Sequence, residues 1–166
     1  MLTALLTIVT QELRLLRRDP TPFIILFIMP VLSLVLFTPA LGAIIREQGH
    51  TQATGIELAL PAMTVMFGSL GAAFLGFSIF REHQWHSWPR LLVSPSPILA
   101  IVLGKMLVPI LLVTGQQLIL LLVAVSFYHS PIPPLLHYSL NALAFALTVT
   151  TLGLLISAYC LSLIHI

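Results

Sequence analysis

Residues 106–127 read MLVPILLVTGQQLILLLVAVSF, and this apolar run contains no charged side chain. A transmembrane helix needs about 20 mostly apolar residues to cross a hydrocarbon core of about 30 Å. Three further runs meet this requirement, at about residues 23–43, 58–80 and 140–161. Strands of a membrane barrel would alternate polar and apolar residues, and these runs do not. The sequence therefore predicts an all-α, polytopic transmembrane helical bundle with four spans.

The composition of the chain points to the same class. Hydrophobic residues make up 58% of it and charged residues only 7%, with a mean hydropathy of +1.08. A soluble domain would carry roughly 25% charged residues, so we expect the lipid bilayer to surround most of this chain. The formal net charge of +2 is small and unevenly placed, which fits membrane orientation and not a nucleic-acid surface. The single cysteine, Cys160, leaves the redox compartment undetermined.

Lysine and arginine decide how the spans are oriented, because loops rich in them stay on the cytoplasmic side. Arg46 is offset by Glu47 and Glu57, and residues 128–139 carry neither lysine nor arginine. The other basic residues are Arg14, Arg17 and Arg18 before the first run, and Arg81, Arg90 and Lys105 between the second and third. We therefore expect a multi-pass protein of the plasma membrane, of the bacterial inner-membrane type, with a cytoplasmic N-terminus.

Residues 1–19 predict an amphipathic helix that lies in the membrane surface, ahead of a transmembrane domain over residues 20–166. Its apolar residues recur at spacings of three and four, as Leu2, Leu5, Leu6, Val9, Leu13 and Leu16. The segment Asp19-Pro20-Thr21-Pro22 then breaks the helix, and Thr21-Pro22 can start the next one, which makes an elbow. A cleaved signal peptide is the alternative. It fits less well because its positive region would be unusually long and no clear cleavage site follows.

The connection between the second and third runs, REHQWHSWPRLLVSPSP at residues 81–97, carries a pattern that resembles a known family. An elbow, a span, a short outer loop, a second span and this segment are similar to the permease subunits of type-2 ATP-binding-cassette (ABC) exporters. The residues that carry the resemblance are Arg81, Glu82, Arg90, Leu91, Leu92, Ser94, Pro95, Leu103, Gly104 and Lys105. Such permeases usually have about six spans, so the chain looks like the N-terminal two-thirds of one. The last residues, 161–166, suggest an artificial end.

The resemblance implies a mechanism and partners. Residues 81–97 would form a cytoplasmic coupling helix on a separate ABC ATPase subunit, with Glu82, His83 and His86 facing that partner. Family members often have glycine near His86 and an acidic residue near Pro89, so we expect the helix to be broken or shortened at Pro89. The implied coupling residues are Arg81, Glu82, His83, His86, Arg90, Leu91, Ser94 and Pro95.

ATP and Mg²⁺ would bind to the partner, and this chain would bind no cofactor. A second permease copy or homologue would complete the transporter. The implied activity is export of a hydrophobic or amphipathic substrate, such as a drug, lipid or lipid-linked glycan, as in multidrug efflux.

Polar residues near the membrane boundary have structural interpretations as well. His83 and His86 lie one helical turn apart beside Glu82, but neither their spacing nor their order fits a zincin site, so we expect no metal. Trp85 and Trp88 suit the lipid–water boundary. The predicted interface anchors are Arg14, Arg17, Arg18, Trp85, Trp88 and Lys105.

Within the runs, Gln116 and Gln117 either form interhelical hydrogen bonds or line a substrate path. Gly68, Ala72 and Gly76 recur every four residues as a small-residue stripe, which favours close helix packing over ligand binding. Pro30 should kink the first span.

Other function classes have less support. The chain has no phosphate-binding Gly-x-x-x-x-Gly-Lys-Ser/Thr loop and no catalytic constellation, and no Asp, Glu, Lys or Arg lies within the four runs. These features argue against an ATPase, an enzyme and a secondary transporter. A membrane scaffold or assembly factor stays open as an alternative, and a small membrane-embedded enzyme is a weaker one.

Overall fold

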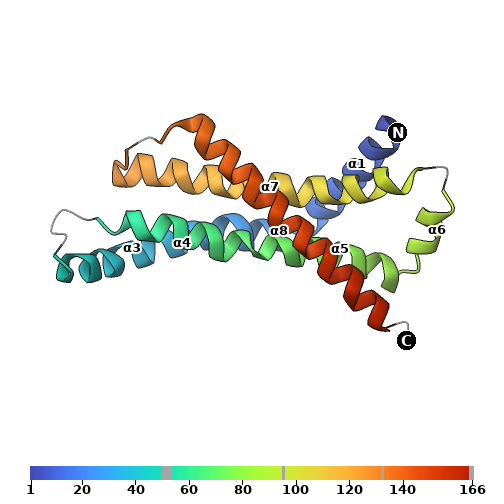
Figure 1. Ribbon diagram of the computed structural model, residues 1–166, viewed down its shortest axis with the longest axis horizontal. Coiled ribbons are helices and arrows are strands. Elements are labelled where there is room, and N and C mark those ends of the chain that lie inside the picture. The colour runs from blue at the N-terminus through green and yellow to red at the C-terminus, as the bar shows by residue number, and fades with distance from the viewer. Residues whose placement is uncertain (50–53, 95, 132, 165–166) are drawn as a thin grey trace.

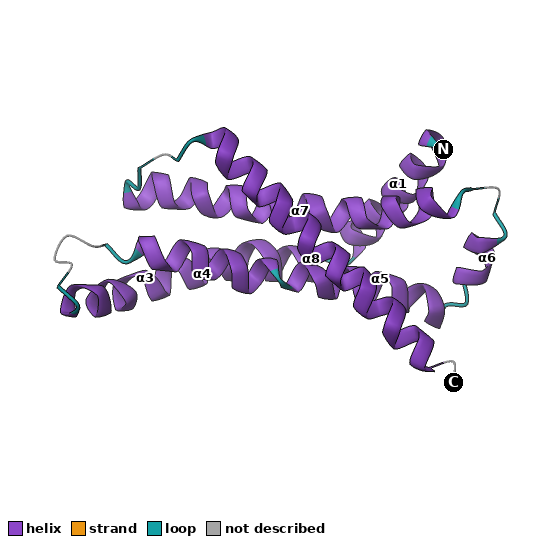
Figure 2. Cartoon of the chain, viewed as in Figure 1, coloured by secondary structure: helices purple, strands orange, loops and turns teal. Residues whose placement is uncertain are grey.

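The structure is a computed structural model that describes residues 1–49, 54–94, 96–131 and 133–164. Helices and short connections account for all of the described chain, without a strand (Figure 2). The helices are α1 (Leu2–Arg18), α2 (Thr21–Phe23), the π-helical turn η1 (Ile24–Ile28), α3 (Met29–Glu47), α4 (Ile56–Gly68), α5 (Leu70–Gln84), α6 (Trp88–Leu92), α7 (Ile98–Tyr128) and α8 (Leu135–Ile164). The predicted all-α helical bundle is confirmed.

Four helical stretches of the described chain are long and apolar enough to cross a membrane. They run over Thr21–Glu47, Ile56–Gln84, Ile98–Tyr128 and Leu135–Cys160. Each one begins before the predicted apolar run. A helix extends beyond its apolar residues to the residues that cap or break it. The largest difference is at α7, which begins directly after the extended residue Pro97. Lys105 is therefore inside a helix and not in a loop.

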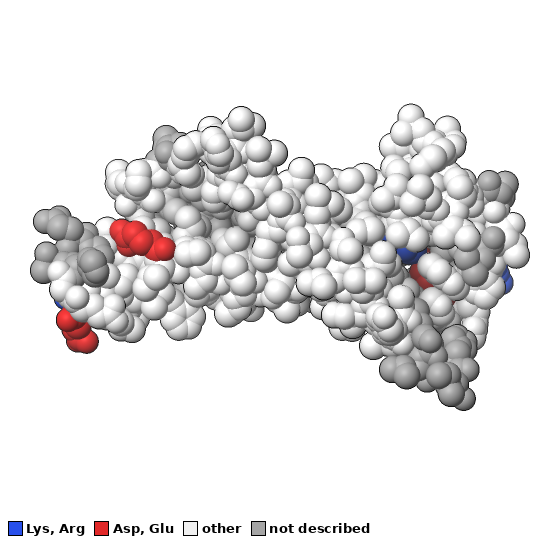
Figure 3. All heavy atoms as spheres, in the orientation of Figure 1, with Lys and Arg blue, Asp and Glu red and all other residues white. Residues whose placement is uncertain are grey.

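The helices α3, α4, α5 and α7 run along the long axis and α8 crosses them obliquely, so the connections gather at two ends (Figure 1). The N-terminus, α6 and the C-terminal end of α8 lie at one end, called here the α6 end, and the α3–α4 and α7–α8 connections lie at the other. The N-terminus and the C-terminal end of α8 lie at the same end because the number of spans between them is even. Charged side chains are seen toward the two ends of the molecule in Figure 3, and the surface between them is uncharged on the face shown.

The core lies where α3, α4 and α7 meet. Leu34, Ala59, Leu120 and Ala124 are fully buried there, and Met63 and Phe67 pack beside them. Many large apolar side chains point outward instead, including Leu36, Phe77 and Leu122 at more than 60% exposure. A bundle surrounded by lipid has no reason to bury such side chains.

Three prolines shape the path of the first span. Pro20 and Pro22 follow Asp19, whose extended backbone ends α1, and the Asp19 Oδ1 accepts a hydrogen bond of 3.1 Å from the Thr21 N–H. The helix α2 begins at Thr21, as predicted, with Pro20 at its N-cap position. Pro30 follows η1, where the wider π-helical turn accommodates a proline that cannot donate to the carbonyl four residues earlier.

Candidate coupling site at the α6 end

The polar centre of the α6 end begins with a glutamate on α1. Glu12 lies one helical turn after Ile8, and both side chains are buried at less than 9% exposure. Ile8 packs so closely on α7 that a Cβ added to Gly104 would lie 2.9 Å from it. The next face of α1 carries Leu2, Leu6 and Leu13, which are exposed as expected for a helix that meets lipid. The basic anchors Arg14, Arg17 and Arg18 are also exposed.

Lys105 holds three elements together. Its Nζ donates hydrogen bonds to Glu12 Oε1 at 2.6 Å, to Glu82 Oε1 at 3.1 Å and to Ser78 Oγ at 3.2 Å. An ammonium has three donors, so all of its hydrogen bonds are made. With 4% of its side chain exposed, Lys105 is not the interface anchor that we predicted. Its two carboxylate partners offset the desolvation penalty of burying the ammonium, whereas an unpaired ammonium would stay in the headgroup region.

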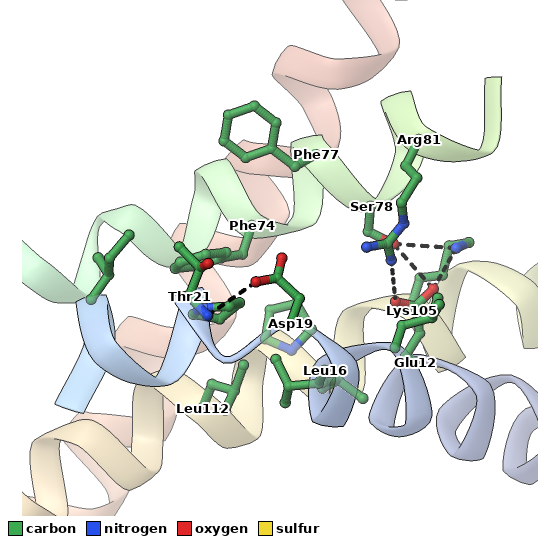
Figure 4. A pocket seen from close by; sticks show the side chains of 15 residues that line it. Glu12, Leu16, Asp19, Thr21, Phe74, Phe77, Ser78, Arg81, Lys105 and Leu112 are labelled. Atoms are coloured by element: carbon green, nitrogen blue, oxygen red, sulfur yellow. Dashed lines mark hydrogen bonds and ion pairs between the residues drawn. The ribbon is translucent and has the colours of Figure 1, made fainter. Parts of the chain in front are cut away.

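Arg81 completes the charge balance of this group. Its Nη2 lies 3.4 Å from Glu12 Oε2, and its guanidinium lies 5.5 Å from the centre of the Trp85 ring. Two cations and two anions therefore share one site, in which only Arg81 is partly exposed, and Ser78 donates to Glu12 Oε1 at 3.1 Å. We call Glu12, Ser78, Arg81, Glu82 and Lys105 the ion cluster; Figure 4 shows most of its contacts as dashed lines.

Glu82 connects the ion cluster to the segment that follows α5. The Ser87 Oγ donates to the Glu82 carboxylate and, at 3.2 Å, to the Glu82 carbonyl, which also accepts the Ser87 N–H at 3.0 Å. Only 3% of Glu82 is exposed. The expectation that this side chain faces a partner is corrected by this burial: the basic residue that it meets is Lys105 of its own chain.

The connection between α5 and α7 presents a different set of side chains outward. Trp85 and Val93 are 61% and 85% exposed, and His86, Pro89 and Arg90 are exposed too. Leu91 and Ser94 are half-buried, and Pro95 lies outside the described residues.

The helix of this connection is interrupted one turn earlier than predicted. The α5 helix ends at Gln84, and His86 takes a left-handed backbone with φ of 54°. That conformation lies in the left-handed region, which favours glycine. Pro89 is in the first turn of α6, where its missing N–H costs nothing. His83 stacks on Trp88 with 5.0 Å between ring centres, so neither side chain is fully exposed.

The two mid-span glutamines are buried between helices. Gln117 donates to the Ala142 carbonyl of α8 at 3.3 Å, which is an interhelical hydrogen bond. Gln116 is 1% exposed, and its amide atoms have no partner among the described residues. Both side chains are buried, at 1% and 4% exposure.

The small-residue stripe on α4 and α5 lies where α8 approaches. A Cβ at Gly68 would lie 2.6 Å from the Phe145 ring, and one at Gly153 would lie 2.6 Å from the Ala72 carbonyl oxygen. Gly76 lies opposite Ser157 at 3.2 Å by the same measure. The structure thus places all three residues of the stripe at helix contacts.

Comparison with protein families gives one assignment. The family model described as ABC-2 type transporter matches residues 3–165. The chain belongs to the ABC-2 type transporter family. The ABC-2 membrane domain is the transporter's membrane component and is not itself catalytic, so this ABC-2 chain is a multi-pass permease subunit of an ABC transporter. Searches of curated proteins and of solved structures found no match.

Sequence reasoning missed Glu12 and Ser78 of the ion cluster, and Ser87 beside it. Glu12 was not considered, although it falls on the same helical face as Leu5, Ile8, Leu15 and Leu16. A carboxylate on an apolar face is a signal of a buried ion pair. Ser87 gave no comparable signal, because its role depends on the turn at His86.

Proposed function

We propose that this ABC-2 permease subunit belongs to an exporter and is driven by a separate ABC ATPase that docks on the connection between α5 and α7. ATP and Mg²⁺ bind to that ATPase. A second permease subunit, identical or homologous, completes the membrane part. The cargo is a hydrophobic or amphipathic molecule, since the spans offer lipid-like surfaces and their middle thirds carry no charged residue.

The observation that carries this proposal is the two-sided character of the connection. Its outer side presents Trp85, Arg90 and Val93, and its inner side is tied through Ser87 and Glu82 to Lys105 of α7 and Glu12 of α1. A partner that displaces α6 therefore acts on three elements at once. Close-packed elements tied in this way move as a unit between discrete arrangements, which is what alternating access requires.

The distribution of charge supports a cytoplasmic position for the α6 end. Exposed Arg14, Arg17, Arg18 and Arg90 lie there, whereas the exposed acidic residues Glu47 and Glu57 lie at the opposite end. By the positive-inside rule, the N-terminus and the connection lie on the cytoplasmic side. The membrane in this proposal is a bacterial inner membrane. An ATPase is available on that side only.

Charge reversal on the outer side of the connection tests the docking. Arg90→Glu should weaken co-purification with the ABC ATPase and its stimulated hydrolysis at least about tenfold, because a reversed interface charge meets like charge. The matched control is Arg14→Glu, the same change on the exposed face of α1. Glu82 is unsuitable for this test, since its reversal would disrupt the ion cluster.

Two results would count against the proposal. One is purification of the intact wild-type transporter without any ABC ATPase, which would favour a scaffold. The other is equal loss of ATPase binding in Arg90→Glu and Arg14→Glu, which would mean that the connection is not the docking element.

A further inference from the structure

A cavity of about 260 Å³ opens beside the ion cluster, between the elbow, α5 and α7 (Figure 4). One side of it is polar, with Asp19, Thr21 and Arg81. The other side is apolar, with Ile25, Phe74 and Leu112. Phe77 lies on its wall and is 69% exposed, so the cavity reaches the outer surface of the chain.

The change from polar to apolar runs in the same direction on all three elements. On the first span Thr21 precedes Ile25, on α7 Lys105 precedes Leu112, and on α5 Phe74 precedes Arg81 as the helix returns. Each polar residue is nearer the α6 end. Lys105 and Leu112 are seven residues apart, which is about 10 Å along a helix. The cavity therefore has a head region at the membrane boundary and an apolar region about 10 Å deep.

Two opposite charges remain available in the head region. Lys105 has used its three donors, and Glu12 is held by Lys105, Arg81 and Ser78. Asp19 is exposed, and hydrogen bonds from Thr21 keep the pKa of its carboxyl below the usual range, so that it is ionised at neutral pH. Arg81 is 30% exposed, its one ion pair is long at 3.4 Å, and its Nε has no partner among the described residues.

We propose that this cavity binds a phospholipid with a primary amine in its head group, of the phosphatidylethanolamine class, from the leaflet at the α6 end. Its ammonium donates to Asp19, its phosphate accepts from Arg81, and the start of one acyl chain lies against Phe74 and Leu112. The lipid is a bound ligand of the permease and not its cargo, so this inference does not depend on the proposed export.

Head-group chemistry distinguishes this lipid from its neighbours in the membrane. A choline head group carries the positive charge but no N–H to donate, and a glycerol head group carries no positive charge. A charge-assisted hydrogen bond to a carboxylate is about twice as strong as a neutral one. The amine lipid should therefore bind about tenfold more tightly than the choline or glycerol lipid with the same acyl chains.

Titration of the purified transporter in detergent with each of these three lipids, followed by native mass spectrometry, measures the preference. In the wild-type protein we expect the tenfold preference for phosphatidylethanolamine. In Asp19→Asn the three affinities should become equal within about twofold, because the amide oxygen still accepts the Thr21 N–H and only the charge is lost. The matched control is Glu57→Gln at the opposite end, where the carboxylate accepts the Gly55 N–H at 2.9 Å; it should keep the preference.

Equal binding of the three lipids by the wild-type protein overturns the proposal without any variant. So does a preference that survives Asp19→Asn or that disappears in Glu57→Gln. If no lipid is retained and the cavity residues instead cross-link to a second permease copy, the cavity is a subunit interface.

Discussion

Lys105 is the residue on which the charge balance of the α6 end depends. It lies between Glu12 and Glu82, which come from helices that are far apart in sequence, and it is nearly inaccessible. A paired buried charge adds little net stability over an apolar residue of the same size, but removing one partner leaves the other charge buried and uncompensated. The ion cluster therefore connects α1, α5 and α7, and the stability of the protein falls when one of its charges is removed.

Lys105→Met should destabilise the protein by about 3–5 kcal/mol, because two buried carboxylates would then share only Arg81. Adding Glu12→Gln restores one anion to one cation and should recover about 2 kcal/mol of that loss. Unfolding in detergent of the wild type, both single variants and the double variant measures the coupling. Simple additivity of the two effects would show that the ion cluster does not exist as described.

At the scale of elements, α8 packs closely against α5 because Gly153 has no side chain at the contact. The Gly153 Cα faces the Ala72 backbone so closely that any Cβ would collide with it. Backbone contact of this kind brings helices together where the hydrophobic effect is absent.

Gly153→Val should cost about 1–3 kcal/mol and loosen α8, because the added atoms meet backbone that cannot move aside. The control is Ala144→Val, which adds methyl groups on an exposed position of the same helix and should change the stability by less than about 0.5 kcal/mol. Limited proteolysis and thermal unfolding measure both. Similar behaviour of the two variants would argue against close contact between α5 and α8.

For the whole molecule, the sequence predicts what depends on the solvent and misses what depends on tertiary contact. The apolar runs, the break after Arg18 and the charged end follow from hydropathy, proline chemistry and the placement of arginine. Glu82 was interpreted as a docking residue because its contact with Lys105 could not be foreseen. The two residues are 23 positions apart, and nothing in the order of residues says that their side chains meet. Glu12 is 93 residues from the same lysine.

The proposed coupling of an ABC ATPase to the bundle is a property of the whole molecule, since it needs both the exposed side of α6 and the ion cluster behind it. Its most direct test is cross-linking in assembled transporter with Cys160 replaced by serine. Single cysteines go at Val93, on the exposed side of the connection, and at Gln48, exposed at the opposite end. A short bifunctional thiol reagent should join the Val93→Cys variant to the ABC ATPase and leave the Gln48→Cys variant unlinked. Cross-linking at position 48 with none at position 93 would contradict the account, because the motor would then act at the other end of the bundle.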